Sequence, residues 1–137
     1  MAFFTTEDTE STEMRPVNEL TELVIGAAIE VHRHLGPGLL ESAYEACLSE
    51  ELKLRKINFS EQLVLPIEYK GKHIENAYRL DFMIEEQLII ELKAVSEIHN
   101  MYRAQLLSYL KLSKCKVGLL INFNVLKLVD GIQRIAL

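Results

Sequence analysis

The chain has 137 residues, 49% of them hydrophobic and 26% charged, which is the composition of one globular domain rather than of a disordered chain. Its 15 basic and 20 acidic side chains give a formal net charge of −5. This charge argues against a broad basic surface for non-specific nucleic-acid binding, but it leaves room for a small basic patch beside an acidic metal site.

The N-terminal segment and the cysteines bear on the cellular compartment. Residues 1–16 are polar, carry mostly acidic charges and end at Pro16, so we expect a flexible acidic tail followed by one domain over residues 17–137. We expect no signal peptide and no membrane-spanning helix, because no apolar run is long enough. Cys47 and Cys115 lie far apart, so we expect neither a zinc site nor a disulfide framework, and a cytoplasmic location.

Two helices are predicted first. Residues 17–35 carry apolar side chains three or four positions apart, which is the spacing of one helix face, and Asn18 is the expected N-cap. The sequence Gly36-Pro37-Gly38 ends this helix, because glycine accepts a positive φ and proline cannot continue the helical hydrogen bonds. A second helix is expected over about residues 39–56.

The middle of the chain changes to strands. Apolar and polar residues alternate over several short segments, as they do in strands with one buried face. The predicted order is two helices, three strands, a helix and two strands. The expected strands cover residues 61–69, 78–85, 88–95, 116–123 and, at the sheet edge, 126–135, and the third helix covers residues 97–113.

The strands over residues 78–85 and 88–95 form a hairpin whose register follows from their apolar residues. These residues make one core face only in a single register, and that register sets Asp81 opposite Glu91. Opposed side chains lie close enough for both carboxylates to reach one cation. The apolar pairs expected on that face are Ile84 with Leu88, Phe82 with Ile90, and Leu80 with Leu92.

The charges of this hairpin predict a metal site. Two like charges directly opposite each other destabilise a sheet unless something offsets them. Lys93 offsets one charge, and a divalent cation offsets the rest; oxygen ligands suit Mg²⁺ or Mn²⁺. The residues alone leave a second interpretation open, in which these are ordinary charges on a solvated sheet face. Gln105 and Tyr109 share a face of the next helix, and an ordinary polar pair at the core edge explains them as well.

Motifs in the same order resemble those of a known group of nucleases. Gly38-Leu39-Leu40-Glu41-Ser42-Ala43-Tyr44 resembles the pattern that names the GxxExxY family, and Asp81 with Glu91-Leu92-Lys93 resembles the motifs of the PD-(D/E)XK nuclease superfamily. Gln105 and Tyr109 resemble the Gln-x-x-x-Tyr element of its RecB-like exonuclease branch. The resemblance implies an α/β (α+β) fold with a restriction-endonuclease-like αβββαβ core, in which helices flank a mixed sheet.

The resemblance also implies a role for individual residues. Asp81 and Glu91 would bind Mg²⁺ or Mn²⁺ together with Glu41 and the backbone carbonyl of Leu92. Lys93 would orient or deprotonate the attacking water and hold the phosphate. On the residues alone, Glu41 is also explained as an acidic side chain in the first turn of a helix, where the helix dipole favours it.

The same resemblance implies the substrate and its contacts. Gln105 and Tyr109 would position the scissile phosphate. Independently of the resemblance, the basic residue Lys111, near the end of their helix, is an expected phosphate contact. The implied function is a divalent-metal-dependent nuclease that hydrolyses phosphodiester bonds in DNA. The alternative is a non-catalytic nucleic-acid or protein-binding module that kept the fold. In either case we expect no membrane partner. A chain of this size has few surfaces to spare for binding a substrate, so a homodimer is also expected as an option. Leu80 departs from the motif, since the superfamily's name has a proline there.

Overall fold

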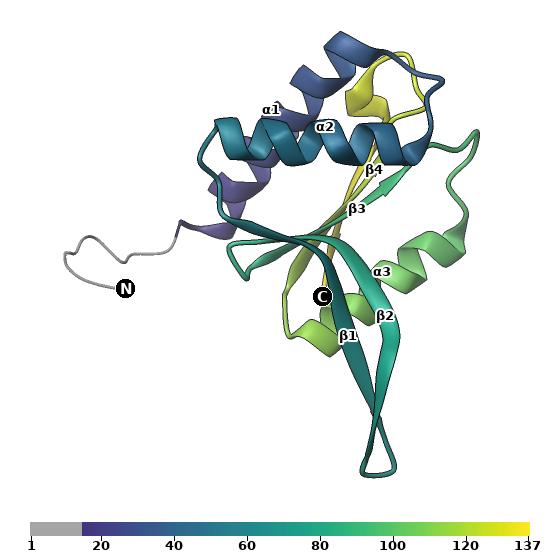
Figure 1. The fold of residues 1–137 in the computed structure, drawn as a ribbon. Coiled ribbons are helices and arrows are strands. Elements are labelled where there is room, and N and C mark those ends of the chain that lie inside the picture. Colours follow the sequence, from purple (N-terminus) through teal and green to yellow (C-terminus); the bar gives the residue numbers. More distant parts are fainter. Residues whose placement is uncertain (1–14) are drawn as a thin grey trace, which may run out of the picture.

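Five strands form one mixed sheet in the order β1-β2-β3-β4-β5, and helices cover both of its faces (Figure 1). The computed structural model describes residues 15–137, apart from the side chains of residues 76 and 77. The expected flexible tail over residues 1–16 lies outside the described residues, except for its last two positions. The elements are α1 (Val17–Leu35), α2 (Glu41–Leu54), β1 (Phe59–Tyr69), β2 (Lys72–Ile84), β3 (Leu88–Lys93), α3 (Asn100–Ser113), β4 (Val117–Asn122), the short 3-10 helix η1 (Leu128–Gly131) and β5 (Ile132–Ala136).

The first two helices begin differently from expectation. α1 has the predicted bounds, but its N-cap is Pro16 and not Asn18, because the chain is already helical at residue 17. The side chain of Asn18 instead accepts a hydrogen bond from Arg134 at 3.0 Å. α2 begins at Glu41, later than predicted, because Leu40 keeps an extended backbone with φ −73° and ψ 151°. Among the described residues, no helix is both long and apolar enough to cross a membrane.

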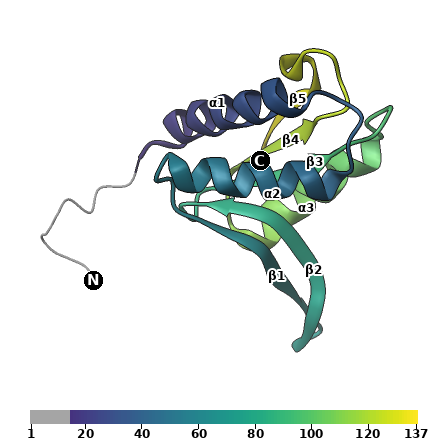
Figure 2. The ribbon, with the colours of Figure 1, turned by 45° about the horizontal axis from the view of Figure 1, so that its top comes forward.

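The helices divide the core into two parts. α1 and α2 pack on one face of the sheet, over a core that includes residues of β2, β3 and β4 (Figures 1 and 2). α3 packs on the other face, over a smaller core that includes Leu106 and Leu110. These layers form an α+β fold consistent with the restriction-endonuclease-like core that the resemblance implied.

The centre of the sheet is a parallel pair. β3 and β4 are parallel and are joined through α3, while all the other neighbouring strands are antiparallel. β4 is buried along its whole length, as a strand covered by helices on both faces must be. The edge strand predicted over residues 126–135 is in fact the turn of η1 followed by the shorter β5.

The register of the β2–β3 hairpin agrees with the prediction at its closed end. Two of the predicted apolar pairs are present in the ladder, namely Ile84 with Leu88 and Phe82 with Ile90. The third predicted pair is wrong. Leu80 lies in the core under α3, whereas Leu92 lies in the core under α1 and α2.

An irregularity at Asp81 explains this difference. Met83 and Leu80 lie in the same core, although side chains three residues apart in a regular strand point to opposite faces. On the neighbouring strand β1, Gln62 has a positive φ of 54°. The β1–β2 ladder is interrupted here, because Gln62 and Asp81 lie opposite each other without pairing. The hairpin therefore exchanges its two faces at Asp81, which the apolar pattern alone did not reveal.

β2 is longer than predicted at its other end. It begins at Lys72 and not near residue 78, and β1 and β2 extend beyond the rest of the sheet as a two-stranded arm (Figure 1). The first residues of β2 are mostly polar, so they lack the apolar alternation from which the strand was predicted. The arm receives its order from pairing with β1 rather than from burial.

Candidate active site

The ladder between β2 and β3 ends at the pair of Phe82 with Ile90, so Asp81 and Glu91 are the first residues beyond it. Beyond the last ladder pair, the backbone N–H of Asp81 donates to Oε2 of Glu91 at 2.9 Å. The backbone N–H of Leu92 donates to Oδ2 of Asp81 at 2.8 Å. Two side-chain carboxylates thus accept N–H groups that backbone carbonyls accept in a regular ladder. The structure brings Asp81 and Glu91 together, and it fixes each of them through the backbone.

The carbonyl of Leu92 points into the same gap between β2 and β3. In an extended strand, the N–H and C=O groups of one residue point to the same side. The N–H of Leu92 points to Asp81, so its carbonyl also points to the β2 side. The carbonyl of Lys93 points the other way and accepts the N–H of Phe123 at 2.9 Å. Three oxygen-bearing groups therefore surround the gap.

Burial favours the protonated forms of both carboxyl groups. Glu91 is only 6% exposed, and burial, followed by the charge of Asp81, raises its pKa to about 8. Burial also raises the pKa of Asp81, although the hydrogen bond from Leu92 and the charge of Lys93 act in the opposite direction. Without a cation, the pair therefore resists carrying two full charges at neutral pH.

Glu41, the first residue of α2, lies near this pair. Burial raises the pKa of Glu41, the charge of Asp81 raises it further, and the charge of Lys93 lowers it. Charges act on each other in this way only at short range. The structure thus brings Glu41 together with Asp81 and Lys93, while Glu41 also occupies the first turn that the helix dipole favours.

Tyr44 fixes the place where α2 begins. Its ring is fully buried and stacks on Phe123 with 4.5 Å between the ring centroids. Its hydroxyl donates to the carbonyl of Gly36 at 2.6 Å and accepts a second hydrogen bond from the loop backbone at 3.1 Å. Gly38 in this loop has φ 98°, which favours glycine. The glycine and the tyrosine of the motif therefore shape the loop that positions Glu41.

Sequence reasoning missed two residues beside Asp81. The side-chain amide of Gln62 donates to Glu45 at 2.7 Å and to Oδ1 of Asp81 at 3.4 Å. Burial, followed by a hydrogen bond with Glu61, raises the pKa of Glu45 to about 7. Glu45 could have been found, because it follows Glu41 by four residues on the same helix face. Gln62 gave no signal, because a left-handed residue within a strand leaves no pattern in the sequence.

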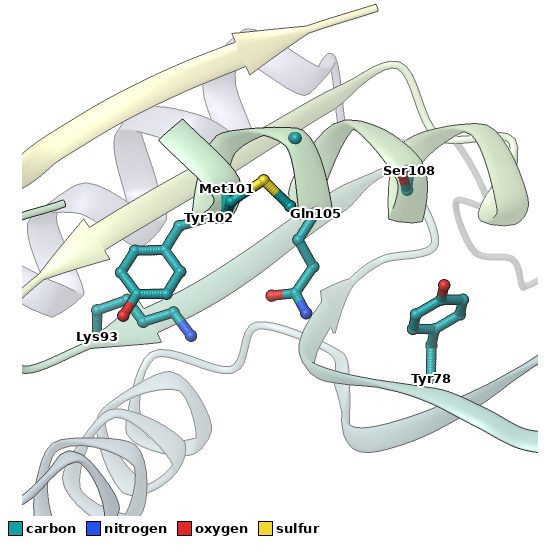
Figure 3. A pocket seen from close by; sticks show the side chains of 7 residues that line it. Tyr78, Lys93, Met101, Tyr102, Gln105 and Ser108 are labelled. Atoms are coloured by element: carbon teal, nitrogen blue, oxygen red, sulfur yellow. The ribbon is translucent and has the colours of Figure 1, made fainter. Parts of the chain in front are cut away.

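A pocket of about 400 Å³ lies beside the end of β3, between β2 and α3 (Figure 3). The amide of Gln105 points into it, between Lys93 and Tyr78. Nζ of Lys93 lies 4.4 Å from the centroid of the Tyr102 ring, which is the geometry of a cation–π contact. The pocket is lined by Tyr78, Lys93, Met101, Tyr102, Ala104, Gln105 and Ser108.

The other two predicted substrate contacts lie apart from this lining. Tyr109 is buried, and its ring meets that of Tyr78 edge to face at 5.4 Å. Burial, followed by the charges of Glu91 and Asp81, raises the pKa of Tyr109 to about 12, so its hydroxyl is a neutral donor near the carboxylates. Lys111 is exposed in the last turn of α3 and does not line the pocket.

Asn122 is a further residue that sequence reasoning missed. It is 4% exposed, and its side chain accepts the N–H of Val95 at 3.0 Å and donates to the carbonyl of Val95 at 2.9 Å. These bonds tie the end of β4 to the chain just beyond Lys93. A single asparagine at the end of an apolar strand was the only available signal.

The donor set suits a hard cation. Asp81 and Glu91 each give one oxygen to a backbone N–H, and the second oxygen of each is left for a cation, with a 3.4 Å contact from Gln62 at Asp81. Mg²⁺ commonly binds through one or two carboxylates and keeps several waters, so these residues fit it. Within residues 15–137, no three His, Cys, Asp or Glu side chains already form a group that could hold a metal ion. A cation here needs the Leu92 carbonyl, water or substrate as further ligands.

Comparison with known proteins identifies the class to which this site belongs. The family profile of the PD-(D/E)XK nuclease superfamily matches residues 18–135. The chain therefore belongs to the PD-(D/E)XK nuclease superfamily, whose members generally use divalent metal ions. Comparison with curated proteins and with solved structures gives no match.

Proposed function

We propose that the protein is a nuclease that uses Mg²⁺ or Mn²⁺ to hydrolyse phosphodiester bonds in DNA. The observation that carries this proposal is the carboxylate pair of the half-buried Asp81 and the buried Glu91, beside Lys93. Burying two like charges is costly, and burial is not needed for a solvated sheet face. A divalent cation between the carboxylates offsets this cost, which favours the metal site over the solvated face.

The proposed ligands of the cation are the carboxylates of Asp81 and Glu91 and the carbonyl of Leu92. The carboxylate of Glu41 from α2 is a further proposed ligand, and it would have to reorient to join them, since the three carboxylates do not form a metal-binding group as they stand. A bound divalent cation lowers the pKa of a coordinated water and neutralises charge that develops on the phosphate. Asp81 and Glu91 are suited to hold it rigidly, because each is braced by a backbone N–H of the other strand. The remaining ligand positions are open to water and to the substrate.

The remaining residues act on the substrate and the water. Lys93 orients or deprotonates the attacking water and holds a phosphate oxygen from the pocket side of the site. Gln105 from α3 and the neutral hydroxyl of Tyr109 hold the scissile phosphate in place. Lys111, at the far end of α3, contacts a more distant phosphate. A bound nucleic-acid strand would therefore meet Lys93 first, then Gln105 and then Lys111.

The finer classification rests on two motifs. The Gly38, Glu41 and Tyr44 pattern supports membership of the GxxExxY family, in which the buried tyrosine shapes the loop before the glutamate. Gln105 and Tyr109 support the RecB-like exonuclease branch. Assembly as a homodimer stays a prediction.

The test is a cleavage assay on single-stranded and double-stranded DNA and RNA, with Mg²⁺, Mn²⁺ or EDTA. We expect cleavage of DNA with either metal, no cleavage in EDTA, and no detectable cleavage by Asp81→Asn. The matched control is Asp130→Asn, which makes the same change on the exposed η1 turn and should cleave like wild type. Equal activity of the two variants would exclude the proposed site.

A non-catalytic binding module remains the second candidate function. The observation that favours it is that one oxygen of Asp81 and one of Glu91 already accept backbone N–H groups, so the pair also serves the structure. The two functions separate in calorimetry with Mg²⁺ and Mn²⁺. A nuclease binds the metal and loses that binding in Asp81→Asn, whereas a binding module takes up nucleic acid equally well in EDTA and cleaves none.

A further inference from the structure

The pocket beside Lys93 has walls that the hydrolysis of a phosphate does not require. Besides Lys93 and Gln105, two tyrosine rings, a thioether and a hydroxyl line it, and they come from β2 and α3 (Figure 3). Met101 lines the pocket although it is apolar and 72% exposed. An apolar side chain held this far in solvent, beside a site that acts on nucleic acid, is a candidate contact for a base.

The size and the chemistry of the pocket suit one flat heterocycle. Its volume of about 400 Å³ falls in the range of small-ligand sites. The rings of Tyr78 and Tyr102 offer aromatic surface on which a base can stack. Ser108, on the same helix as Tyr102, offers a hydroxyl that both donates and accepts, which is what the edge of a base requires.

The charge of the chain points to the same kind of ligand. Lys93 is the one basic residue among those that line the pocket, and the whole chain has a net charge of −5. Binding to intact duplex depends on many contacts between Lys or Arg and phosphates. Proteins that bind single strands combine a positively charged groove with stacking of bases on aromatic side chains, so part of their affinity does not come from charge.

We propose that this pocket holds one unpaired base of the strand that is cut, next to the phosphate at Lys93. This inference rests on the proposed nuclease function and adds the substrate class. The favoured substrate is single-stranded nucleic acid or an unpaired end, since a base inside a duplex must first be unpaired and unstacked before it can enter the pocket. Tyr102 and Met101 contact the base, and the hydroxyl of Ser108 contacts its edge.

The first test measures binding without cleavage. Fluorescence anisotropy in EDTA compares a single-stranded DNA 12-mer, the same sequence as a blunt duplex, and free thymidine monophosphate. We expect the single strand to bind at least about fivefold more tightly than the duplex, and the mononucleotide at least about tenfold more weakly than the strand. Equal affinity for strand and duplex, or for strand and mononucleotide, overturns the inference.

Variants of α3 assign the binding to the pocket. Tyr102→Leu should weaken single-strand binding about fivefold, and Tyr102→Phe should restore it, because the phenylalanine keeps the ring. Leu112→Ala is the matched control, since Leu112 is exposed on the same helix and does not line the pocket. An equal loss in Leu112→Ala, or no loss in Tyr102→Leu, overturns the inference.

A second test uses cleavage, and it separates this inference from the proposed function. Single strands that lack one base, at successive positions, are cut with Mg²⁺. We expect cutting to fall at least about tenfold at one constant distance from the missing base. A protein that cuts every such strand equally is a nuclease without the base pocket. A protein that cuts nothing, but prefers the single strand in EDTA, has the pocket without the proposed activity.

Discussion

The two ends of the β2–β3 hairpin use the same pair of strands for different purposes. At the closed end, the ladder is regular, and its apolar residues from Phe82 to Ile90 stabilise the fold by burial. At the open end, the ladder stops, and the half-buried Asp81 and the buried Glu91 are desolvated there at a cost. The comparison shows that the candidate site lies at the first positions where the backbones of β2 and β3 no longer form hydrogen bonds with each other.

The largest expected effects separate the two ends. Ile90→Ala at the closed end should lower the free energy of unfolding by about 2–5 kcal/mol, because it leaves a cavity at a fully buried position. Cleavage per folded molecule should change little. Asp81→Asn should do the reverse, since asparagine can still accept the N–H of Leu92 while it loses the charge that binds metal. Urea unfolding in EDTA and cleavage rates measure the two effects, and a large loss of stability in Asp81→Asn would mean that the open end is structural.

The pH dependence of stability should also distinguish the ends. The pKa of Glu91 rises from the ordinary value of 4.5 to about 8 in the folded protein, so folding favours its protonated form. The stability that Glu91 contributes is fully present below about pH 4.5 and is lost as the pH rises through about 8. Between pH 5 and 9 in EDTA, wild type should therefore lose at least about 1.4 kcal/mol relative to Glu91→Gln, which corresponds to one pKa unit.

Urea unfolding of both proteins at a series of pH values checks this prediction. Mg²⁺ should restore stability to wild type most strongly at high pH, because the metal binds the deprotonated carboxylates. Parallel curves for wild type and Glu91→Gln in EDTA would contradict it.

The sequence predicted the regular end of the hairpin better than the open end. The period of two in the apolar residues is a strong signal where a strand is straight, and it gave the pairs Phe82–Ile90 and Ile84–Leu88. The same rule failed at Leu80, because the strand exchanges its faces at Asp81, opposite the left-handed backbone of Gln62 on β1. Local patterns carry no information about such a distant neighbour.

The candidate site was predicted to a similar extent. The structure brings together Asp81, Glu91, Lys93 and Glu41, which the motifs named. The motifs predicted this because their residues lie on elements that pack together in the fold. The hydrogen bonds from the backbone to the carboxylates were not foreseen, since they depend on the end of the ladder. These bonds also make asparagine, rather than alanine, the informative substitution at Asp81, because alanine leaves the buried N–H of Leu92 without an acceptor.

A substitution of Glu41 tests whether α2 contributes a side chain to the site at the open end of the hairpin. Glu41→Gln should leave the melting temperature in EDTA nearly unchanged and lower metal-dependent cleavage at least tenfold, a loss of about 1.4 kcal/mol in transition-state stabilisation. Glu19→Gln is the matched control, because Glu19 is the acidic residue in the first turn of α1. Both variants lose the same interaction with a helix dipole. If both cleave like wild type, Glu41 serves only the start of its helix.

The smallest effect is expected at Gln62, where strain and hydrogen bonding oppose each other. Glycine at this position relieves the cost of a φ of 54°, roughly 1 kcal/mol, but it removes the hydrogen bonds to Glu45 and Asp81, which contribute a similar amount. Gln62→Gly should therefore leave the free energy of unfolding within about 0.5 kcal/mol of wild type. Lys114→Gly, at a φ of 65° beyond the end of α3, relieves the same strain without such a loss and should be stabilising.

Cleavage then decides what the irregularity at Gln62 does for the site. If the amide of Gln62 orients Asp81, Gln62→Gly should lower the affinity for Mg²⁺ and the cleavage rate by about threefold, and Lys114→Gly should change neither. Calorimetry with Mg²⁺ measures the first quantity independently of cleavage. Unchanged affinity and rate in Gln62→Gly would mean that the exchange of faces is held by the strands themselves, and that Asp81 keeps its place without the side chain beside it.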